Sequence, residues 1–299
     1  MKTKIILTFT FLLCLTNISA QDVLTPEEMN SVYKKEKHHN KKVQPYAPLR
    51  QADVMWSRKI WREIDLRQKI NHPFYYPEND GVAHTINDRK SLIDVIYSAI
   101  KEGSITAYGN AAMDDEFREE MTKNDISTIG GAKEELIEVI DWDAVAQGAD
   151  PDEAKTTKLN KSEFNRNTVK KWRLKEEWFF DKQRSVMDVR ILGIAPLQED
   201  KDEVTGALTG TFSPLFWVYF PEARNILVNA EVFNLVKNDA ERRTYDDIFW
   251  KRMFGSTIVK EANVMDRKIN EYMVGLDALL EAERIKEEIF NIEHDLWEY

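Results

Sequence analysis

The stretch KEEWFFDKQRSVMDVRILGIAPL, residues 175–197, carries the strongest fold signal in the sequence. Across residues 172–181 apolar and charged side chains largely alternate, which is typical of a β-strand whose two faces meet different surroundings. Alternation resumes after the polar tetrapeptide DKQR, and its parity shifts at Gly193, which indicates a β-bulge. The stretch therefore predicts a β-hairpin that turns at residues 181–184.

The next apolar run, PLFWVYF at residues 214–220, is apolar on both faces and predicts a third, central strand. The polar residues 199–210 before it predict an exposed connection. Three consecutive strands joined in this way make an antiparallel meander. Pro221 and Glu222 then suit the first turn of a helix, because proline loses no needed hydrogen bond there and a carboxylate meets the positive end of the helix dipole.

The flanks of this block show helical patterns. Apolar residues near three-to-four spacing predict a helix from Ala52 to Leu66. A second helix is predicted with Asn87 or Asp88 as its N-cap and Gly103 at its end. Residues 104–110 suggest a short strand, and residues 113–122 a polar helical turn.

The C-terminal segment, residues 263–297, has an apolar stripe that predicts one long helix, or two helices joined near Gly275. The stripe suits docking on the core or pairing with a partner helix in a coiled coil. Residues 148–162 lose apolar side chains altogether and predict a loop or flexible insert.

These elements predict an α+β fold, in which a small antiparallel meander is covered by helices from both flanks and the chain ends in a long amphipathic helix. We expect a signal peptide at residues 1–20, an extended basic arm at 21–50, and a single domain at 51–299 with an insert near 148–162.

The first twenty residues have the layout of a secretory signal: two lysines, a short apolar run, and Ala20 before the expected cut. The run is too short to span a bilayer, which needs about 20 apolar residues. Cleavage before Cys14 would instead anchor the chain through a lipid. Cleavage at Ala20 leaves no cysteine, and therefore no disulfide, catalytic thiol or thiolate metal site.

The net charge and the absence of known motifs exclude several classes of function. Removing Lys2 and Lys4 with the signal shifts the formal net charge from −10 to −12, which argues against nucleic acid or anionic lipid as the main partner. The sequence has no nucleotide-binding glycine motif, no nucleophile elbow and no zinc-binding histidine pair, so we expect no cofactor or metal.

Paired carboxylates leave a glycan hydrolase open, because that reaction needs only two acidic groups facing each other across a cleft. The candidates are Asp114, Asp115, Glu116, Glu119, Glu120 and Glu176. The many aromatic side chains would also suit a glycan-binding module, although most of them fall on apolar periods that favour packing.

Three segments closely resemble the GldN/PorN family of gliding-motility and type IX secretion proteins of Bacteroidetes. They are WRLKEEWFFDKQRSVMDVRILGIAPL (172–197), IWREIDLRQKINHPFYYP (60–77) and SPLFWVYFPEARNILVNAEVFNLVKNDAERRTYDDIFWKRMF (213–254). The resemblance runs from about Ala52 to the C-terminus and does not cover the signal, the arm or the insert.

The resemblance implies a periplasmic protein at the inner face of the outer membrane, without enzyme activity or cofactor. It implies assembly into rings with other copies of itself and with a lipoprotein of the GldK/PorK type, and contact with the periplasmic part of the GldL/GldM motor complex. These rings are required for protein export and, in gliding species, for motility.

The partner-binding residues are predicted from the sequence alone. Phe179 lies on the opposite face of its strand from Trp178 and Phe180, beside the charged turn, and is a candidate aromatic anchor; the alternative is that all three aromatics are core. The other candidates are the turn residues Lys182 and Arg184 and the basic residues of the arm, Lys34, Lys35, Lys37, Lys41 and Lys42. The arm itself is either a solvated linker or a tether along an acidic neighbour.

Overall fold

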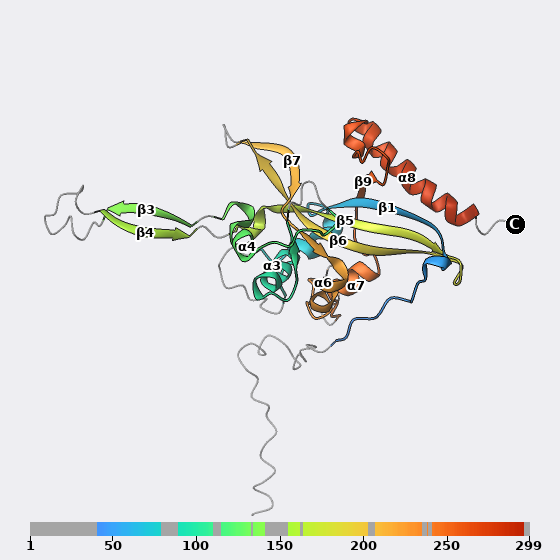
Figure 1. Cartoon of the computed structure of the whole chain (residues 1–299), viewed down its shortest axis with the longest axis horizontal. Helices are drawn as coiled ribbons and strands as arrows, with labels where there is room; N and C mark the ends of the chain where they lie inside the picture. The colour runs from blue at the N-terminus through green and yellow to red at the C-terminus, as the bar shows by residue number, and fades with distance from the viewer. Residues whose placement is uncertain are drawn as a thin grey trace, which may run out of the picture. The chain divides into compact units, whose positions relative to one another are not determined.

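The computed structural model describes residues 41–78, 89–109, 115–132, 134–140, 155–161, 164–202, 207–234, 238 and 241–295. The signal peptide, most of the predicted arm and the predicted N-caps Asn87 and Asp88 lie outside these residues. The described chain forms an α+β fold built on an antiparallel sheet (Figure 1).

The predicted hairpin is confirmed and forms the centre of the sheet. β5 (Val169–Asp181) pairs with β6 (Val186–Lys201), and Asp181 lies opposite Val186 across the turn. The predicted bulge is also confirmed: Lys175 pairs with Gly193 and Glu176 with Ile191, so Leu192 is the extra residue. Gly193 has a steric reason as well, because a Cβ atom there would lie 2.5 Å from the Phe117 ring.

The sheet extends on both sides of this hairpin in the order β2-β8-β6-β5-β1-β9, with β7 paired to β6. The added strands are β1 (Val54–Asp65), β2 (Ala107–Tyr108), β7 (Leu208–Pro214), β8 (Trp217–Tyr219) and β9 (Thr257–Glu261). A separate hairpin joins β3 (Glu134–Ile140) to β4 (Lys155–Lys161).

The helix predicted over residues 52–66 is wrong, because this segment is strand β1. Its register on β5 runs without interruption from Trp56 opposite Phe180 to Asp65 opposite Lys171. The four-residue spacing of Ile60 and Ile64 fits a period of two as well as a period of 3.6, and β-branched and aromatic residues favour a strand where pairing is offered.

Three further predictions need correction. Residues 155–161 of the predicted insert form β4, and residues 199–201 and 208–210 of the predicted connection lie in β6 and β7. The predicted helical turn at 113–122 is not helical over the described residues 115–122, and Glu120 within them forms a bridge to Tyr108 of β2.

The helices are α2 (His72–Tyr75), α3 (Leu92–Glu102), α4 (Lys123–Thr128), α6 (Phe220–Leu227), α7 (Tyr245–Trp250) and α8 (Leu276–Asp295). Ser91 caps α3, so the prediction of Asn87 or Asp88 as its N-cap is wrong. Gly103 ends the helix in the left-handed conformation, as predicted for that glycine. Pro221 and Glu222 lie in the first turn of α6, also as predicted. Short 3₁₀ turns occur at Gln51–Asp53, Lys69–Asn71, Ile129–Gly131, Arg166–Thr168 and Ile269–Glu271.

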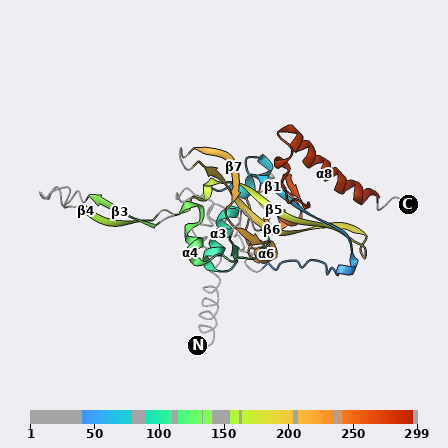
Figure 2. The same cartoon turned by 45° about the horizontal axis from the view of Figure 1, so that its top comes forward.

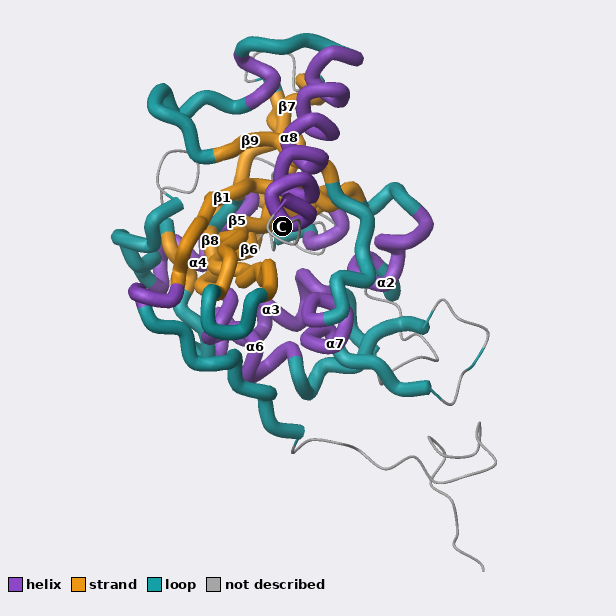
Figure 3. The backbone as a smooth tube through the Cα atoms, turned by 90° about the vertical axis from the view of Figure 1, so that its right-hand side faces the viewer, coloured by secondary structure: helices purple, strands orange, loops and turns teal. Residues whose placement is uncertain are grey.

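The predicted C-terminal helix begins later than its apolar stripe, because Gly275 adopts a positive φ of 64° directly before α8. The helices α3, α6 and α7 form one group and α8 forms another, and both groups pack on the same face of β5. Trp172 and Leu174 belong to the main core with residues of α3, α6 and α7, whereas Trp178 packs against the core cluster of α8. Figures 2 and 3 show α8 along the β1–β9 end of the sheet and α6 beside β6.

α8 docks through a stripe of small and branched residues. Ile285, fully buried, packs with Ile60 and Ile258, and Ala278, Ala282 and Ile289 continue the stripe. Of the two alternatives predicted for the C-terminal stripe, docking on the core is therefore the one that this side of the helix adopts.

We predict that Ile285→Ala lowers the free energy of unfolding by about 2–4 kcal/mol, because the truncation opens a cavity between α8 and the sheet. Leu280→Ala on the exposed side of the same helix is the matched control and should change it by less than about 0.5 kcal/mol. Urea unfolding followed by circular dichroism measures both; equal effects would mean that α8 is not docked through this stripe.

Candidate functional site

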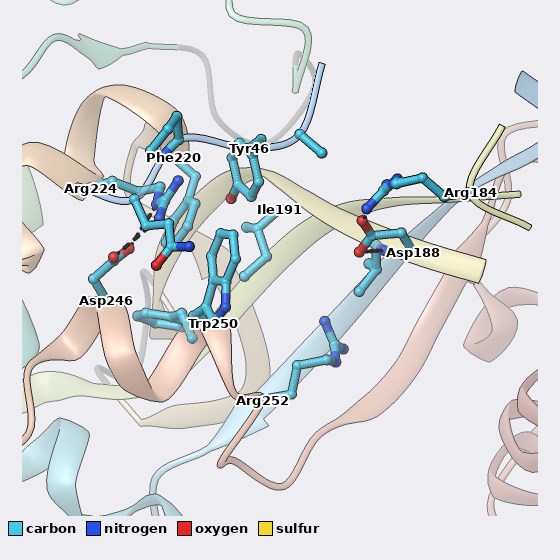
Figure 4. Close-up of a pocket in the computed structure, with 14 residues that line it drawn as sticks. Tyr46, Arg184, Asp188, Ile191, Phe220, Arg224, Asp246, Trp250 and Arg252 are labelled. Carbon is cyan, nitrogen blue, oxygen red and sulfur yellow. Dashed lines mark hydrogen bonds and ion pairs between the residues drawn. The ribbon is translucent and has the colours of Figure 1, made fainter. Parts of the chain in front are cut away.

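A cavity of about 480 Å³ lies between the N-terminal end of the described chain and the helical side of the sheet (Figure 4). We call residues 41–50 the strap; they form no regular helix or strand. Its residues 44–47 line the cavity together with residues of β6, α6, α7 and the loop after α7. Pro45 and Pro48 keep the strap extended, because proline fixes φ and disfavours helix at the preceding residue.

Tyr46 holds the middle of the strap in place. Its ring stacks on Trp250 at 5.4 Å between centroids, and the guanidinium of Arg224 lies 4.4 Å from its centre. Arg190 lies 5.1 Å from the same ring and donates a hydrogen bond to the carbonyl oxygen of Ala47. Burial raises the pKa of the Tyr46 phenol, an effect that the Arg224 charge opposes.

The arginine that contacts the Tyr46 ring belongs to a buried ion pair. Arg224 Nε and Nη2 donate to the two carboxylate oxygens of Asp246 at 2.7 and 3.1 Å, and both residues are buried. The pair joins α6 to the first turn of α7, where Thr244 and Asp247 form a capping box. Because the pairing is bidentate, the orientation of Arg224 under Tyr46 is fixed by α7.

Lys41, one of the predicted arm residues, attaches the start of the strap. Its Nζ lies 2.8 Å from Asp247, and its backbone N–H donates to the side chain of Asn229. Burial would raise the pKa of Asp247, but hydrogen bonds from Lys41 and Thr244 hold it below its usual value. Lys42 is exposed, and Lys34, Lys35 and Lys37 lie outside the described residues.

The predicted turn residues lie at the other end of the strap. Arg184 lines the cavity and pairs with Asp181 at 2.6 Å and with Asp188 at 3.0 Å, whereas Lys182 is exposed. The hydrogen bond from Arg184 holds the pKa of the Asp181 carboxyl below its usual value. The turn therefore brings one predicted residue to the cavity and leaves the other in solvent.

Phe179 is buried in its own chain, with 3% of its surface exposed. The arginine beside it is Arg190, 5.2 Å from the ring centre, and not Arg184. Arg190 thus lies against both Phe179 and Tyr46. It connects the strap to the face of β5 that carries Phe179, the face whose covering the sequence did not predict. A role of Phe179 in partner binding stays a prediction.

Two carboxylates considered for glycan hydrolysis have structural partners on opposite faces of the sheet. Asp115 accepts from Lys175 at 3.2 Å, whereas Glu176 lies between Arg62 at 3.2 Å and Arg252 at 2.9 Å. Adjacent residues of a strand point to opposite faces, so the sheet separates these two carboxylates. They cannot flank one glycosidic bond.

Sequence reasoning missed the cavity itself. Tyr46, Arg224 and Trp250 come from three distant segments, and only the apolar tyrosine between two prolines marks the strap as a segment with a docking role. Within the described residues, no three His, Cys, Asp or Glu side chains gather as they would around a metal ion. None of the described helices is long and apolar enough to cross a membrane.

We predict that Asp246→Asn lowers the free energy of unfolding by about 3–5 kcal/mol, because it leaves the buried Arg224 charge without its counterion. The double variant Arg224→Met with Asp246→Leu removes both charges and should recover most of that loss. Urea unfolding at pH 7 measures both variants; a double variant less stable than Asp246→Asn would contradict the ion-pair explanation.

We also predict that Phe179→Ala lowers the free energy of unfolding by about 3 kcal/mol or more, as expected for a buried phenylalanine. Val186→Ala, at a more exposed position of the same hairpin, is the control and should have a much smaller effect. Thermal unfolding gives the comparison, and an unchanged melting temperature for Phe179→Ala would show that the ring is not part of the core.

Comparison with known proteins supplies the family. The sequence profile described as "Gliding motility associated protein GldN" matches residues 49–298, which include the strap residues Leu49 and Arg50 and nearly all of the body. No curated protein sequence matches the chain. Because the profile covers most of the sequence, the chain belongs to the GldN family, a family of components of the gliding-motility and type IX secretion machinery.

Proposed function

We propose that the mature protein is a non-enzymatic structural subunit of the periplasmic, outer-membrane-associated ring of the type IX secretion system, required for protein export and gliding motility. Family membership supports a place in this machinery. The resemblance supports the ring and the periplasmic location, and the signal sequence supports export with cleavage near Ala20.

The observation that carries the proposal is the apolar surface of the described body. Large apolar side chains are more than half exposed along α8, among them Leu276, Leu279, Leu280 and Phe290, and Val274 directly precedes the helix. Clustered surface of this kind is typical of proteins that bind other proteins. A subunit that binds copies of itself and further components needs several such contacts.

The partners we propose are a GldK/PorK-type outer-membrane lipoprotein, other copies of the chain, and the periplasmic part of the GldL/GldM motor complex. The charged side chains lining the cavity support a structural role for that site: Arg224, Arg184 and Arg252 each have a carboxylate partner. A paired guanidinium holds elements together and is already neutralised.

We predict that a tagged chain, extracted from its native host in mild detergent, co-purifies with the lipoprotein as a very large particle visible by negative-stain microscopy. The same extraction from a strain lacking the lipoprotein is the control and should yield smaller species. Recovery as a free monomer from both strains would contradict the ring proposal, and a lytic zone on a peptidoglycan gel would favour the hydrolase instead.

A further inference from the structure

Helix α8 has two apolar faces, and the fold uses one of them. Ala278, Ala282, Ile285 and Ile289 face the sheet. On the other side, Leu276, Leu279, Leu280 and Phe290 are 70%, 57%, 59% and 65% exposed. At about 100° per residue these four centre roughly opposite the buried stripe.

The exposed residues form a line along the helix axis. Leu276, Leu279 and Leu280 share the first turn, and Phe290 follows Leu276 by about four turns on the same side. Val274, just before the helix, is 83% exposed and extends the apolar line. A narrow line of side chains, about four turns long, is complementary to the ridges of another helix and offers no concave site for a small molecule.

The same outer face is acidic between its apolar ends. Glu283 and Glu287 lie on the line between Leu280 and Phe290. Glu283 pairs with Lys286 at 2.8 Å, and Glu287 has no ion-pair partner among the described residues. Arg284, the other base of the helix, is held by Glu281 at 2.7 Å. The helix sequence carries seven acidic residues against these two bases, so the helix as a whole is negative.

We propose that this outer face of α8 docks an amphipathic helix of another protein, one with apolar residues at three-to-four spacing and Lys or Arg opposite Glu283 and Glu287. Leucines and Phe290 supply the apolar contact, and the two glutamates select a basic helix and set its register, as a polar residue within a coiled-coil seam does. The inference extends the proposed function by naming a contact surface and its partner class, and it rests on that function for its biological setting.

The test uses the full mature chain and two synthetic helical peptides with identical leucine positions, one with lysines and one with glutamates beside the leucine stripe. Fluorescence anisotropy should show binding of the lysine peptide at least tenfold tighter than of the glutamate peptide, and the affinity should fall as salt increases. Equal binding of both peptides, or binding of neither, overturns the proposal.

Variants locate the contact. Leu279→Ala with Phe290→Ala should weaken binding of the lysine peptide at least tenfold, whereas Leu208→Ala, an equally exposed leucine on β7, should leave it unchanged. Glu287→Lys should reduce the preference for lysine at least tenfold. Because all of these positions are exposed, each variant should melt within a few degrees of the parent. Binding unaffected by the α8 variants overturns the proposal.

A second copy is the competing occupant. If the purified chain self-associates in analytical ultracentrifugation and the double variant is monomeric, the face binds copies of the chain and the proposal of a separate partner helix is wrong. The peptide assay contains no lipoprotein and no membrane, so its failure is distinguishable from failure of the ring proposal.

Discussion

The structure depends on β5 being paired on both sides and buried on both faces. β5 bonds to β6 and to β1 over most of its length, so every other strand of the main sheet is reached through one of these two neighbours. Its helical face meets two separate helical groups. On its other face, Arg173 and Lys175 are buried against Glu63 and Asp115.

Burying charged residues in the middle of a sheet demands that each one finds a partner, since an unpaired buried charge is strongly destabilising. Glu176 shows how that demand organises the fold. It is fully buried and receives Arg62 from β1 and Arg252 from the loop between α7 and β9. The ion pairs thus join β5 to its neighbour β1 and to the segment that leads into β9.

At the surface, the strap is likewise held by contacts with arginine side chains. Its tyrosine lies against Arg224 and Arg190. Asp246 of α7 holds Arg224 in place, whereas Arg190 donates its hydrogen bond to Ala47 of the strap itself. The described chain therefore has two different kinds of surface: a strap held by aromatic and cationic contacts, and a helix with an apolar face that the fold does not use. Both suit a component that works by contact with other proteins.

The sequence by itself determined the β5–β6 hairpin, its bulge at Gly193, the first turn of α6 with Pro221 and the end of α3 at Gly103. Each of these depends on local backbone chemistry or on strict alternation, which a single sequence displays. It also determined the family, because the motifs that carry the resemblance are contiguous. The candidate site was only partly visible: Lys41 and Arg184, which we predicted as partner-binding residues, lie in the strap and at the cavity, but the Tyr46–Arg224–Trp250 contact was not predicted.

Only the tertiary structure decided that residues 54–65 form a strand, that Phe179 is buried, and that α8 buries one apolar side and exposes the other. Ile60 and Ile64 fit either period, and pairing with β5 made them a strand. Phe179 was equally compatible with a partner surface and with the core, and in the folded chain it is buried with Arg190 of β6 beside its ring. Burial depends on what packs against a residue, and that partner is set by the three-dimensional arrangement and not by the residue's immediate neighbours.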